Sequence, residues 1–354
     1  MIKNKLVIPI LAVLLGFITG AVVMLATGHN PIEAYTALLK GAGFLGDLKR
    51  FGDTLLNATT LILTGLSVAF AFRTGLFNIG AAGQMLMGGF ASVYIGASFV
   101  LPSYIHVPLA VVGAMLFGAI WAFVPGILKA KFKIHEVVSC IMMNSIAIWT
   151  VFYLVPVLIP GSFDTESRPI NQTASLRVDW LTKIFDGSFV NIGLILAIMC
   201  IFLVWWILEK TTFGYELKSV GFNIHASKYA GMKVERNMVL SMMISGALAG
   251  LAGATYYIGF ADNIKIGMLT SHGFDGIAVA LLGLNTPFGV GLTALLFGLM
   301  NAGRLFMQAS TDVPNELVPI IIAIIIFFAA TSLMLKSIIQ RIERLYKKKN
   351  VGDI

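Results

Sequence analysis

Long stretches without a charged side chain alternate with short charged segments along the chain. A helix rises about 1.5 Å per residue, so a hydrocarbon core of about 30 Å needs roughly 20 uncharged residues. Six stretches meet this requirement directly: residues 6–27, 54–72, 137–163, 189–208, 237–261 and 317–335. The pattern predicts helices that cross a membrane repeatedly. The first stretch is longer than a signal-peptide core of about 7 to 15 residues, so we expect it to be retained as a span.

Two longer regions have to be divided before the spans can be counted. Residues 74–128 contain no Asp, Glu, Lys or Arg, and Leu101-Pro102-Ser103 places a turn in the middle, which makes two spans. Residues 266–303 are interrupted by Asp275 and by the sequence Asn285-Thr-Pro. This second region forms either one span with a re-entrant piece or two short spans, which leaves nine or ten in total.

The positions of lysine and arginine decide between nine and ten spans, because positively charged loops stay on the cytoplasmic side. With ten spans, 17 of the 25 Lys and Arg residues lie inside and 8 lie outside; with nine, 12 lie inside and 13 outside. The sequence therefore predicts an all-α polytopic membrane protein with about ten transmembrane helices. We expect broken or short helices in each half and both termini in the cytoplasm.

Composition and motifs narrow the classes of function. Hydrophobic residues make up 58% of the chain and charged residues 12%, with a mean hydropathy of +0.88, which excludes a soluble protein of this size. No G-x-x-x-x-G-K followed by Ser or Thr occurs, so the chain has no P-loop with which to hydrolyse ATP. The five histidines lack metal-ligand spacing and no G-x-S-x-G is present, so we expect neither an enzyme nor a bound metal or cofactor. Cys140 and Cys200 predict no disulfide framework.

Polar and backbone-breaking residues at membrane depth are the candidates for a translocation pathway. They gather in residues 75–89 and 273–291, and interrupted hydrophobic segments in two halves of a transporter commonly mark its pathway. A carboxylate within a span costs about 2.5 to 3.5 kcal/mol, so Asp275 either faces a cavity or gate or caps a helix at the outer mouth. The candidate pathway residues are Asn78, Gln84, Asn144, Asp275, Asn285 and Asn301. For Asn78, Gln84, Asn144 and Asn301, hydrogen bonding between helices is an equal alternative.

Two loops and the C-terminal tail are candidate contact surfaces. In the inner loop, residues 209–236, Asn223 can cap a short helix over residues 224–230 that Gly231 ends, which suits docking to a soluble motor. The alternative is an amphipathic helix on the membrane surface. The outer loop, residues 161–188, has mixed charge and either meets a soluble partner or is a solvated connection. The basic tail, residues 341–354, most simply touches anionic headgroups.

Three passages carry a resemblance to a known family: FNIGAAGQMLMGG at 77–89, GYELKSVGFNIHASKYAGMKV at 214–234 leading into SGALAGLAGA at 245–254, and GFDGIAVALLG at 273–283. These segments resemble the permeases of bacterial ATP-binding-cassette importers for branched-chain amino acids, ribose and nucleosides. The wording of the third passage is most similar to the nucleoside branch.

The resemblance implies a division of labour. Residues 1–340 would form one permease domain in the bacterial plasma membrane, paired with a second permease, identical or distinct. A separate ATPase subunit would use ATP and Mg, and an extracytoplasmic lipoprotein or periplasmic protein would deliver the substrate. No nucleic acid partner is expected. The residues that match the ATPase-coupling position are Glu216, Gly221, Asn223, Ala226, Tyr229, Ala230 and Gly231.

Two alternatives stay open at this point. An importer of the same family could carry ribose, other sugars or branched-chain amino acids, since hydroxyl and amide groups would serve any of these substrates. An ion-coupled secondary transporter needs coupling carboxylates at membrane depth, and only Asp275 qualifies.

Overall fold

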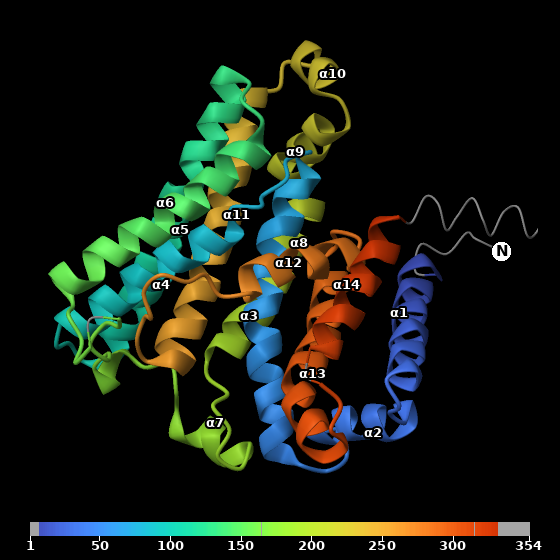
Figure 1. Cartoon of the computed structure of the whole chain (residues 1–354). Coiled ribbons are helices and arrows are strands. Elements are labelled where there is room, and N and C mark those ends of the chain that lie inside the picture. The colour runs from blue at the N-terminus through green and yellow to red at the C-terminus, as the bar shows by residue number, and fades with distance from the viewer. Residues whose placement is uncertain (1–6, 164, 315, 332–354) are drawn as a thin grey trace, which may run out of the picture. The chain divides into compact units, whose positions relative to one another are not determined.

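The computed structural model describes residues 7–163, 165–314 and 316–331, which form helices joined by turns and loops (Figure 1). Within them the only extended pairings are two isolated bridges, Pro160 with Ser167 and Glu166 with Lys265. The all-helical class predicted from the sequence is confirmed. The basic tail, residues 341–354, lies outside the described residues. The chain divides into two compact units, residues 1–41 with 303–354 and residues 42–302. The sequence analysis did not foresee this division, and the single domain over residues 1–340 stays a prediction.

The larger unit contains most of the helices. They are α3 (Leu48–Arg73), α4 (Ala81–Ser98), α5 (Ser103–Phe132), α6 (Glu136–Leu158), η1 (Gln172–Ala174), α7 (Asp179–Ile184), α8 (Gly193–Lys210), α9 (Thr212–Phe222), α10 (Ile224–Tyr229), α11 (Val234–Tyr256), the π-helical turn η2 (Tyr257–Ala261) and α12 (His272–Leu282). The division between the units falls within α13 (Pro287–Thr311). The smaller unit holds α1 (Val7–Ala26), α2 (Pro31–Gly41) and α14 (Leu317–Ala330).

Seven helices in the described part of the chain are long and apolar enough to cross a membrane: α1, α3, α5, α6, α8, α11 continued by η2, and α13. Helices α12 and α14 are apolar but shorter. The uncharged region 74–128 divides into α4 and α5, with the turn at Phe99 to Pro102, and the region 266–303 holds two separate helices. The protein is therefore a multi-pass membrane protein. The total of about ten spans and the side of each terminus stay predictions.

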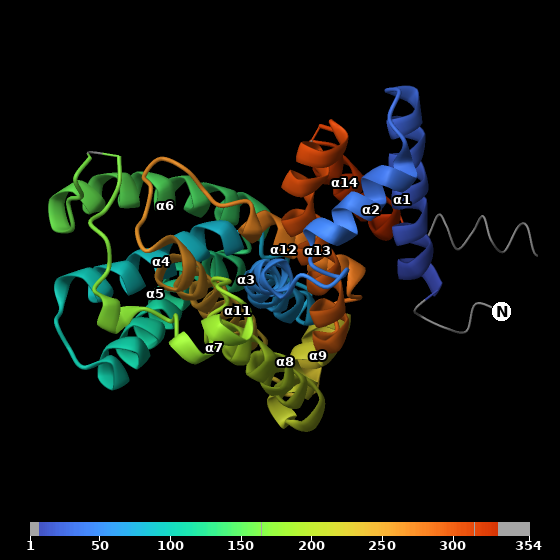
Figure 2. The ribbon, with the colours of Figure 1, turned by 90° about the horizontal axis from the view of Figure 1, so that it is seen from below.

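The core of the larger unit is built on α3 and α11, which pack against each other (Figure 2). Helix α3 also contacts α8 and α12, while α11 also contacts α4 and α5. Glycine lets these helices approach closely: a Cβ at Gly250 would overlap the carbonyl oxygen of Ala114, and one at Gly253 would overlap that of Met85. Small residues at such contacts maximise van der Waals packing where no hydrophobic effect acts between helices. The glycine-rich run 245–254 therefore serves helix packing.

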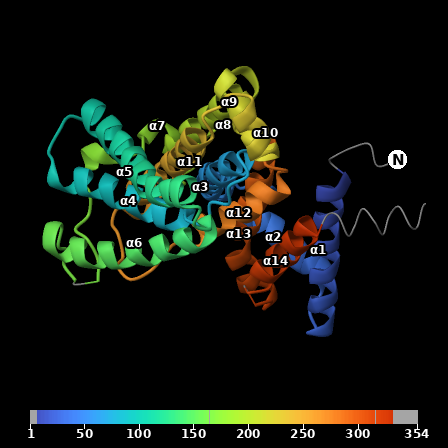
Figure 3. The same ribbon diagram turned by 90° about the horizontal axis from the view of Figure 1, so that it is seen from above.

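Loops gather at two opposite ends of the larger unit. One end carries α9 and α10, the turn between α5 and α6, and the last residues of α3 (Figure 3). At the other end lie α7 and the start of α3, where Ser188 donates a hydrogen bond to Asp53 at 2.8 Å (Figure 2). The predicted inner loop, residues 209–236, and the predicted outer loop, residues 161–188, thus lie at opposite ends. We call them the α10 end and the α7 end.

The smaller unit is held by helix pairing of the same kind. Gly20 of α1 lies against the side chain of Ile321 in α14, where a Cβ would come within 2.6 Å of it. The Tyr35 hydroxyl of α2 donates a hydrogen bond to the carbonyl oxygen of Phe17 at 2.6 Å. This contact satisfies the hydroxyl group, whose burial would otherwise be costly.

Candidate functional site

Two short helices, α9 and α10, form the α10 end, and each begins at a side-chain cap. The Thr211 hydroxyl accepts a hydrogen bond from the backbone N–H of Gly214 at 3.1 Å, and the Asn223 Oδ1 accepts one from Ala226 at 3.0 Å. Such caps satisfy backbone N–H groups that have no partner within the helix. The short helix that the sequence placed over residues 224–230, capped by Asn223, is present as α10. Gly231 follows it with φ of 79°, a conformation that favours glycine.

Two aromatic side chains lie exposed at the α10 end, Phe222 as the last residue of α9 and Tyr229 as the last residue of α10. Phe222 is 91% exposed and Tyr229 is 95% exposed, and Ala226 and Ala230 of the same turn are exposed too. Exposed large aromatic side chains are the type that binding interfaces bury as anchors. Three of the predicted coupling residues, Ala226, Tyr229 and Ala230, are therefore accessible to a partner, and their coupling role stays a prediction.

Helix α9 is tied to the helix bundle at two points. Leu217 and Val220 are buried, and the half-buried Glu216 carboxylate accepts a hydrogen bond from the buried Asn237 at 2.7 Å. At the end of α9 a Cβ on Gly221 would overlap the carbonyl oxygen of Arg73, so only glycine allows this backbone contact. Glu216 and Gly221, predicted as coupling residues, thus connect α9 to α11 and to the end of α3.

The turn between α12 and α13 also contacts the end of α3, beside α9. The Arg73 Nε donates a hydrogen bond to the carbonyl oxygen of Asn285 at 2.9 Å. Leu284 and Asn285 have φ values of 55° and 52°, so the turn from α12 to α13 carries two successive left-handed residues. A small cavity of about 210 Å³ lies among these elements, lined by Phe72, Arg73, Lys218, Gly221, Phe222, Leu284 and Asn285. Asn285, predicted in the pathway, therefore lies at the α10 end. Sequence reasoning missed Arg73, which it counted only as an inside charge.

Two of the predicted pathway amides form one closed network. Asn78 donates to the Gln84 side-chain oxygen at 2.7 Å, and Gln84 donates back to Asn78 at 3.0 Å. Asn78 also donates to the hydroxyl of Ser245, which itself donates to the carbonyl oxygen of Ser67 at 2.6 Å. The Asn78 side chain is 0% exposed and Gln84 1%. Their contacts join α3, α4 and α11, which favours hydrogen bonding between helices. Ser67 and Ser245 were not foreseen as members, because nothing distinguishes a buried serine in an apolar run.

Asn144 of α6 forms hydrogen bonds to the non-helical connection between α3 and α4 and to the first turn of α4. Its side-chain nitrogen donates to the carbonyl oxygen of Ile79 at 3.1 Å, and its oxygen accepts from the backbone N–H of Gly83 at 2.9 Å. Residues 74–80 connect α3 to α4 outside a helix, so the carbonyl oxygen of Ile79 needs a partner from another segment. Asn144 supplies that partner.

The two glycine-rich segments predicted to break helices meet in the structure. A Cβ on Gly273 would overlap the Cα of Ala82, and one on Gly276 would lie 2.7 Å from the Thr64 side chain. The first turn of α12 thus contacts the first turn of α4, at the level of Thr64 within α3. Asp275 lies half-buried in this first turn of α12, and Asn301 lies half-buried on α13. The pathway roles of these residues stay predictions.

At the α7 end, one arginine ties the outer loop to η2. The Arg177 guanidinium donates to the carbonyl oxygens of Gly259 and Phe260, pairs with the Asp262 carboxylate at 3.1 Å and lies over the Phe189 ring. Burial raises the pKa of the Asp262 carboxyl, an effect that Arg177 partly offsets. Sequence reasoning counted Arg177 only as an outside charge. Arg177 therefore joins the end of the outer loop to the rest of the larger unit.

Many apolar helices, with interrupted helices in the core of the larger unit, are typical of a membrane transport subunit. The chain matches the family model of the branched-chain amino acid transport system permease component over residues 51–330 and belongs to that family.

Three relatives extend the match to nearly the whole chain. The guanosine ABC transporter permease protein NupP of Bacillus subtilis is 45% identical, covering 96% of this chain and 97% of its own. The nucleoside ABC transporter permease protein NupB of Lactococcus lactis is 39% identical, covering 96% and 94%. A glucose ABC transporter permease of Haloferax volcanii is 30% identical, covering 92% and 87%. The resemblance drawn from the three sequence passages is confirmed.

Proposed function

We propose that this chain is the permease subunit of an ATP-driven importer of nucleosides in the bacterial plasma membrane. The observation that carries the proposal is the near full-length identity to a guanosine permease and a nucleoside permease, at 45% and 39%. The missing P-loop supports a transport subunit that relies on a separate ATPase, with ATP and Mg bound by that partner and no cofactor held by this chain.

The topology that goes with this proposal has ten spans and both termini in the cytoplasm. Seven helices meet the length and hydropathy of a span, and α4, α12 and α14 complete the ten. Helix α4 has 18 residues and is almost wholly buried, so its lower hydropathy follows from its place in the core. Helix α12 runs from the level of Thr64 to the level of Arg73 and covers only part of a span. In this topology the α10 end is cytoplasmic, in agreement with the excess of Lys and Arg there.

The α10 end and the α7 end of the larger unit would each contact a different partner protein. The ATPase would dock on α10 and the exposed Phe222 and Tyr229 beside it, and the substrate-binding protein would meet the α7 end, where Arg177 joins the outer loop to η2. A second permease, identical or distinct, would complete the pathway. Closure of the ATPase pair would move α9 and α10, and their backbone contact with the end of α3 would carry that movement to α12. The substrate passes without covalent chemistry, by a shift between inward and outward states.

The experiment that tests this proposal is uptake of labelled guanosine by cells that lack the chain and by cells in which it is restored. We expect uptake to return with the chain, to stop when ATP is depleted and to continue when the proton gradient is dissipated. Uptake that an uncoupler abolishes while ATP is maintained would contradict an ATP-driven importer.

A sugar importer is the second candidate, because the glucose permease is 30% identical over most of both chains. The same cells distinguish the two substrates. Excess unlabelled nucleoside should suppress the guanosine uptake, and excess glucose or ribose should leave it unchanged. Restored sugar uptake without nucleoside uptake would favour the second candidate.

A further inference from the structure

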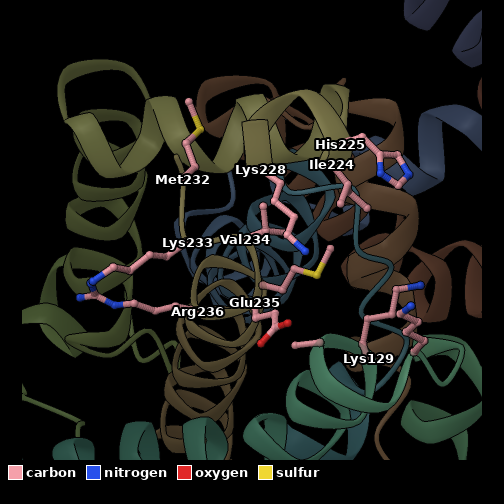
Figure 4. Close-up of a pocket in the computed structure, with 12 residues that line it drawn as sticks. Lys129, Ile224, His225, Lys228, Met232, Lys233, Val234, Glu235 and Arg236 are labelled. Atoms are coloured by element: carbon pink, nitrogen blue, oxygen red, sulfur yellow. The ribbon is translucent and has the colours of Figure 1, made fainter. Parts of the chain in front are cut away.

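A large cavity lies between α10 and the neighbouring ends of α5 and α11 (Figure 4). Its volume is about 780 Å³, and its cationic lining consists of Lys129, Lys133, Lys228, Lys233 and Arg236. Lys228 extends from α10 toward the space between α10 and α5, with Lys129 on the facing side (Figure 4). The end of α5 and the later, consecutive helices α10 and α11 thus contribute cations to one cavity.

The positive charge of this cavity is largely uncompensated. Glu235 is the acidic residue of the lining, and Lys129 forms an ion pair at 2.8 Å with Glu136 of α6. Lys133, Lys228 and Arg236 form no ion pair with any residue among 7–163, 165–314 and 316–331. Unpaired cations that line one cavity repel one another unless an anion joins them. The cavity therefore favours a ligand with negative charge.

Most of the remaining lining is apolar and adjoins the hydrophobic surface of the helices. It consists of Ala130, Ile224, Met232, Val234 and Met238, and His225 completes the wall. Next to the cavity, Phe132 is 67% exposed and Val138 is 52% exposed, on the ends of helices α5 and α6 that are candidate spans. Cations at the boundary of an apolar helix surface are placed at the depth of lipid headgroups. A fully soluble anion would not need the apolar wall.

We propose that this cavity binds the phosphate of an anionic membrane lipid, with the glycerol and upper acyl carbons against the apolar wall. The lipid phosphate would join Lys228 of α10 to Lys133 of the α5–α6 turn, and so hold α10 in place. That α10 docks an ATPase rests on the proposed function, but the lipid site itself does not. A lipid that binds only the ordered arrangement stabilises it by mass action.

The test measures lipid binding directly, without transport. The assembled complex is placed in nanodiscs with increasing phosphatidylglycerol in phosphatidylcholine, and retained lipid is counted by native mass spectrometry. We expect phosphatidylglycerol to be retained, and the double variant Lys133→Gln/Lys228→Gln to weaken its retention at least about tenfold. The charge-preserving pair Lys133→Arg/Lys228→Arg should keep it.

A matched control removes the same charge nearby. Lys131 and Lys210 lie on the same side of the larger unit and do not line the cavity. We expect Lys131→Gln/Lys210→Gln to change retention by less than about twofold, because only general surface attraction is lost. Equal losses in both double variants would overturn a specific site.

Two further measurements distinguish other sources of negative charge. Competition by millimolar inorganic phosphate as strong as that by the lipid would show a site for free phosphate. If Lys133→Gln/Lys228→Gln left lipid retention unchanged and lowered only association of the ATPase, the cavity would meet an acidic protein segment instead. Either result would overturn the lipid proposal and leave the proposed nucleoside import unaffected. Conversely, failure of the chain to restore guanosine uptake, with normal lipid retention, would contradict nucleoside import and leave the lipid proposal standing.

Discussion

Arg73 donates a hydrogen bond from its Nε to the backbone carbonyl oxygen of Asn285 at 2.9 Å, across a sequence separation of 212 residues. The bond joins the last residue of α3 to the turn between α12 and α13. On its other side, the backbone of Arg73 contacts Gly221 at the end of α9. Three helices that the sequence keeps far apart therefore meet at one arginine, between the proposed docking site on α10 and the half-length helix α12.

Replacing Arg73 should separate these elements. A hydrogen bond from a charged donor contributes about 1.5 to 3 kcal/mol, so we expect Arg73→Gln to lower substrate-stimulated ATPase activity of the assembled transporter about tenfold. The complex should still assemble, because the buried helix contacts remain. Arg168→Gln, in the outer loop, is the matched control. Full stimulation in Arg73→Gln would show that the contact with Asn285 is not needed for coupling.

The contact at Gly221 can be tested by adding one methyl group. In Gly221→Ala the new Cβ would overlap the Arg73 carbonyl oxygen, and overpacking of this kind costs about 1 to 3 kcal/mol. We expect a lower thermal unfolding midpoint and weaker ATPase stimulation. Gly187, with φ of 85° and open space around it, is the control. Gly187→Ala should cost only about 1 kcal/mol of backbone strain and leave ATPase stimulation unchanged.

Coupling to the ATPase should need a capping oxygen at the start of α10, and should not need asparagine specifically. Asn223→Ala removes the acceptor for the Ala226 N–H, which costs about 1 kcal/mol of helix stability. Because α10 has only one and a half turns or so, we expect this loss to loosen it and reduce ATPase stimulation severalfold. Asn223→Asp and Asn223→Ser keep a capping oxygen and should restore stimulation. If neither restores it, Asn223 contacts the partner directly.

The hydrogen-bond network around Asn78 indicates that this side chain joins helices and does not contact the substrate. Asn78→Leu would leave the side chains of Gln84 and Ser245 buried with fewer partners, at about 1 to 3 kcal/mol for each unsatisfied group. We expect less monodisperse protein after detergent extraction, with an unchanged KM for nucleoside in the protein that remains. A raised KM at normal stability would instead support the pathway role expected from the sequence.

Asp275 provides the corresponding test for α12. We expect Asp275→Asn to impair guanosine uptake at least about tenfold while membrane insertion and complex assembly persist, because a carboxylate in a span is retained for function more often than for stability. Asp179→Asn at the start of α7 is the control for loss of one acidic side chain. Normal uptake by Asp275→Asn would reduce this residue to a helix cap.

Many features of this fold can be predicted from short stretches of the sequence. The length of each uncharged run, the turn before α5 and the cap at Asn223 depend on neighbouring residues alone, and each lies in the structure where the sequence placed it. Membrane insertion makes such local prediction effective, because a helix in lipid must satisfy its own backbone. The three sequence passages likewise identified the family before any contact was known.

The tertiary structure decided which of the polar residues meet. Asn78 and Ser245 are 167 residues apart, and their hydrogen bond exists because glycines let α4 and α11 approach closely. The contact of Gly273 with Ala82 and the bond from Arg73 to Asn285 have the same origin. Helix faces are selected by side-chain packing and hydrogen bonding between segments distant in sequence, because lipid provides little hydrophobic force to distinguish one apolar face from another. The order of the helices was therefore readable from the chain, whereas their contacts, and the basic cavity beneath α10, were not.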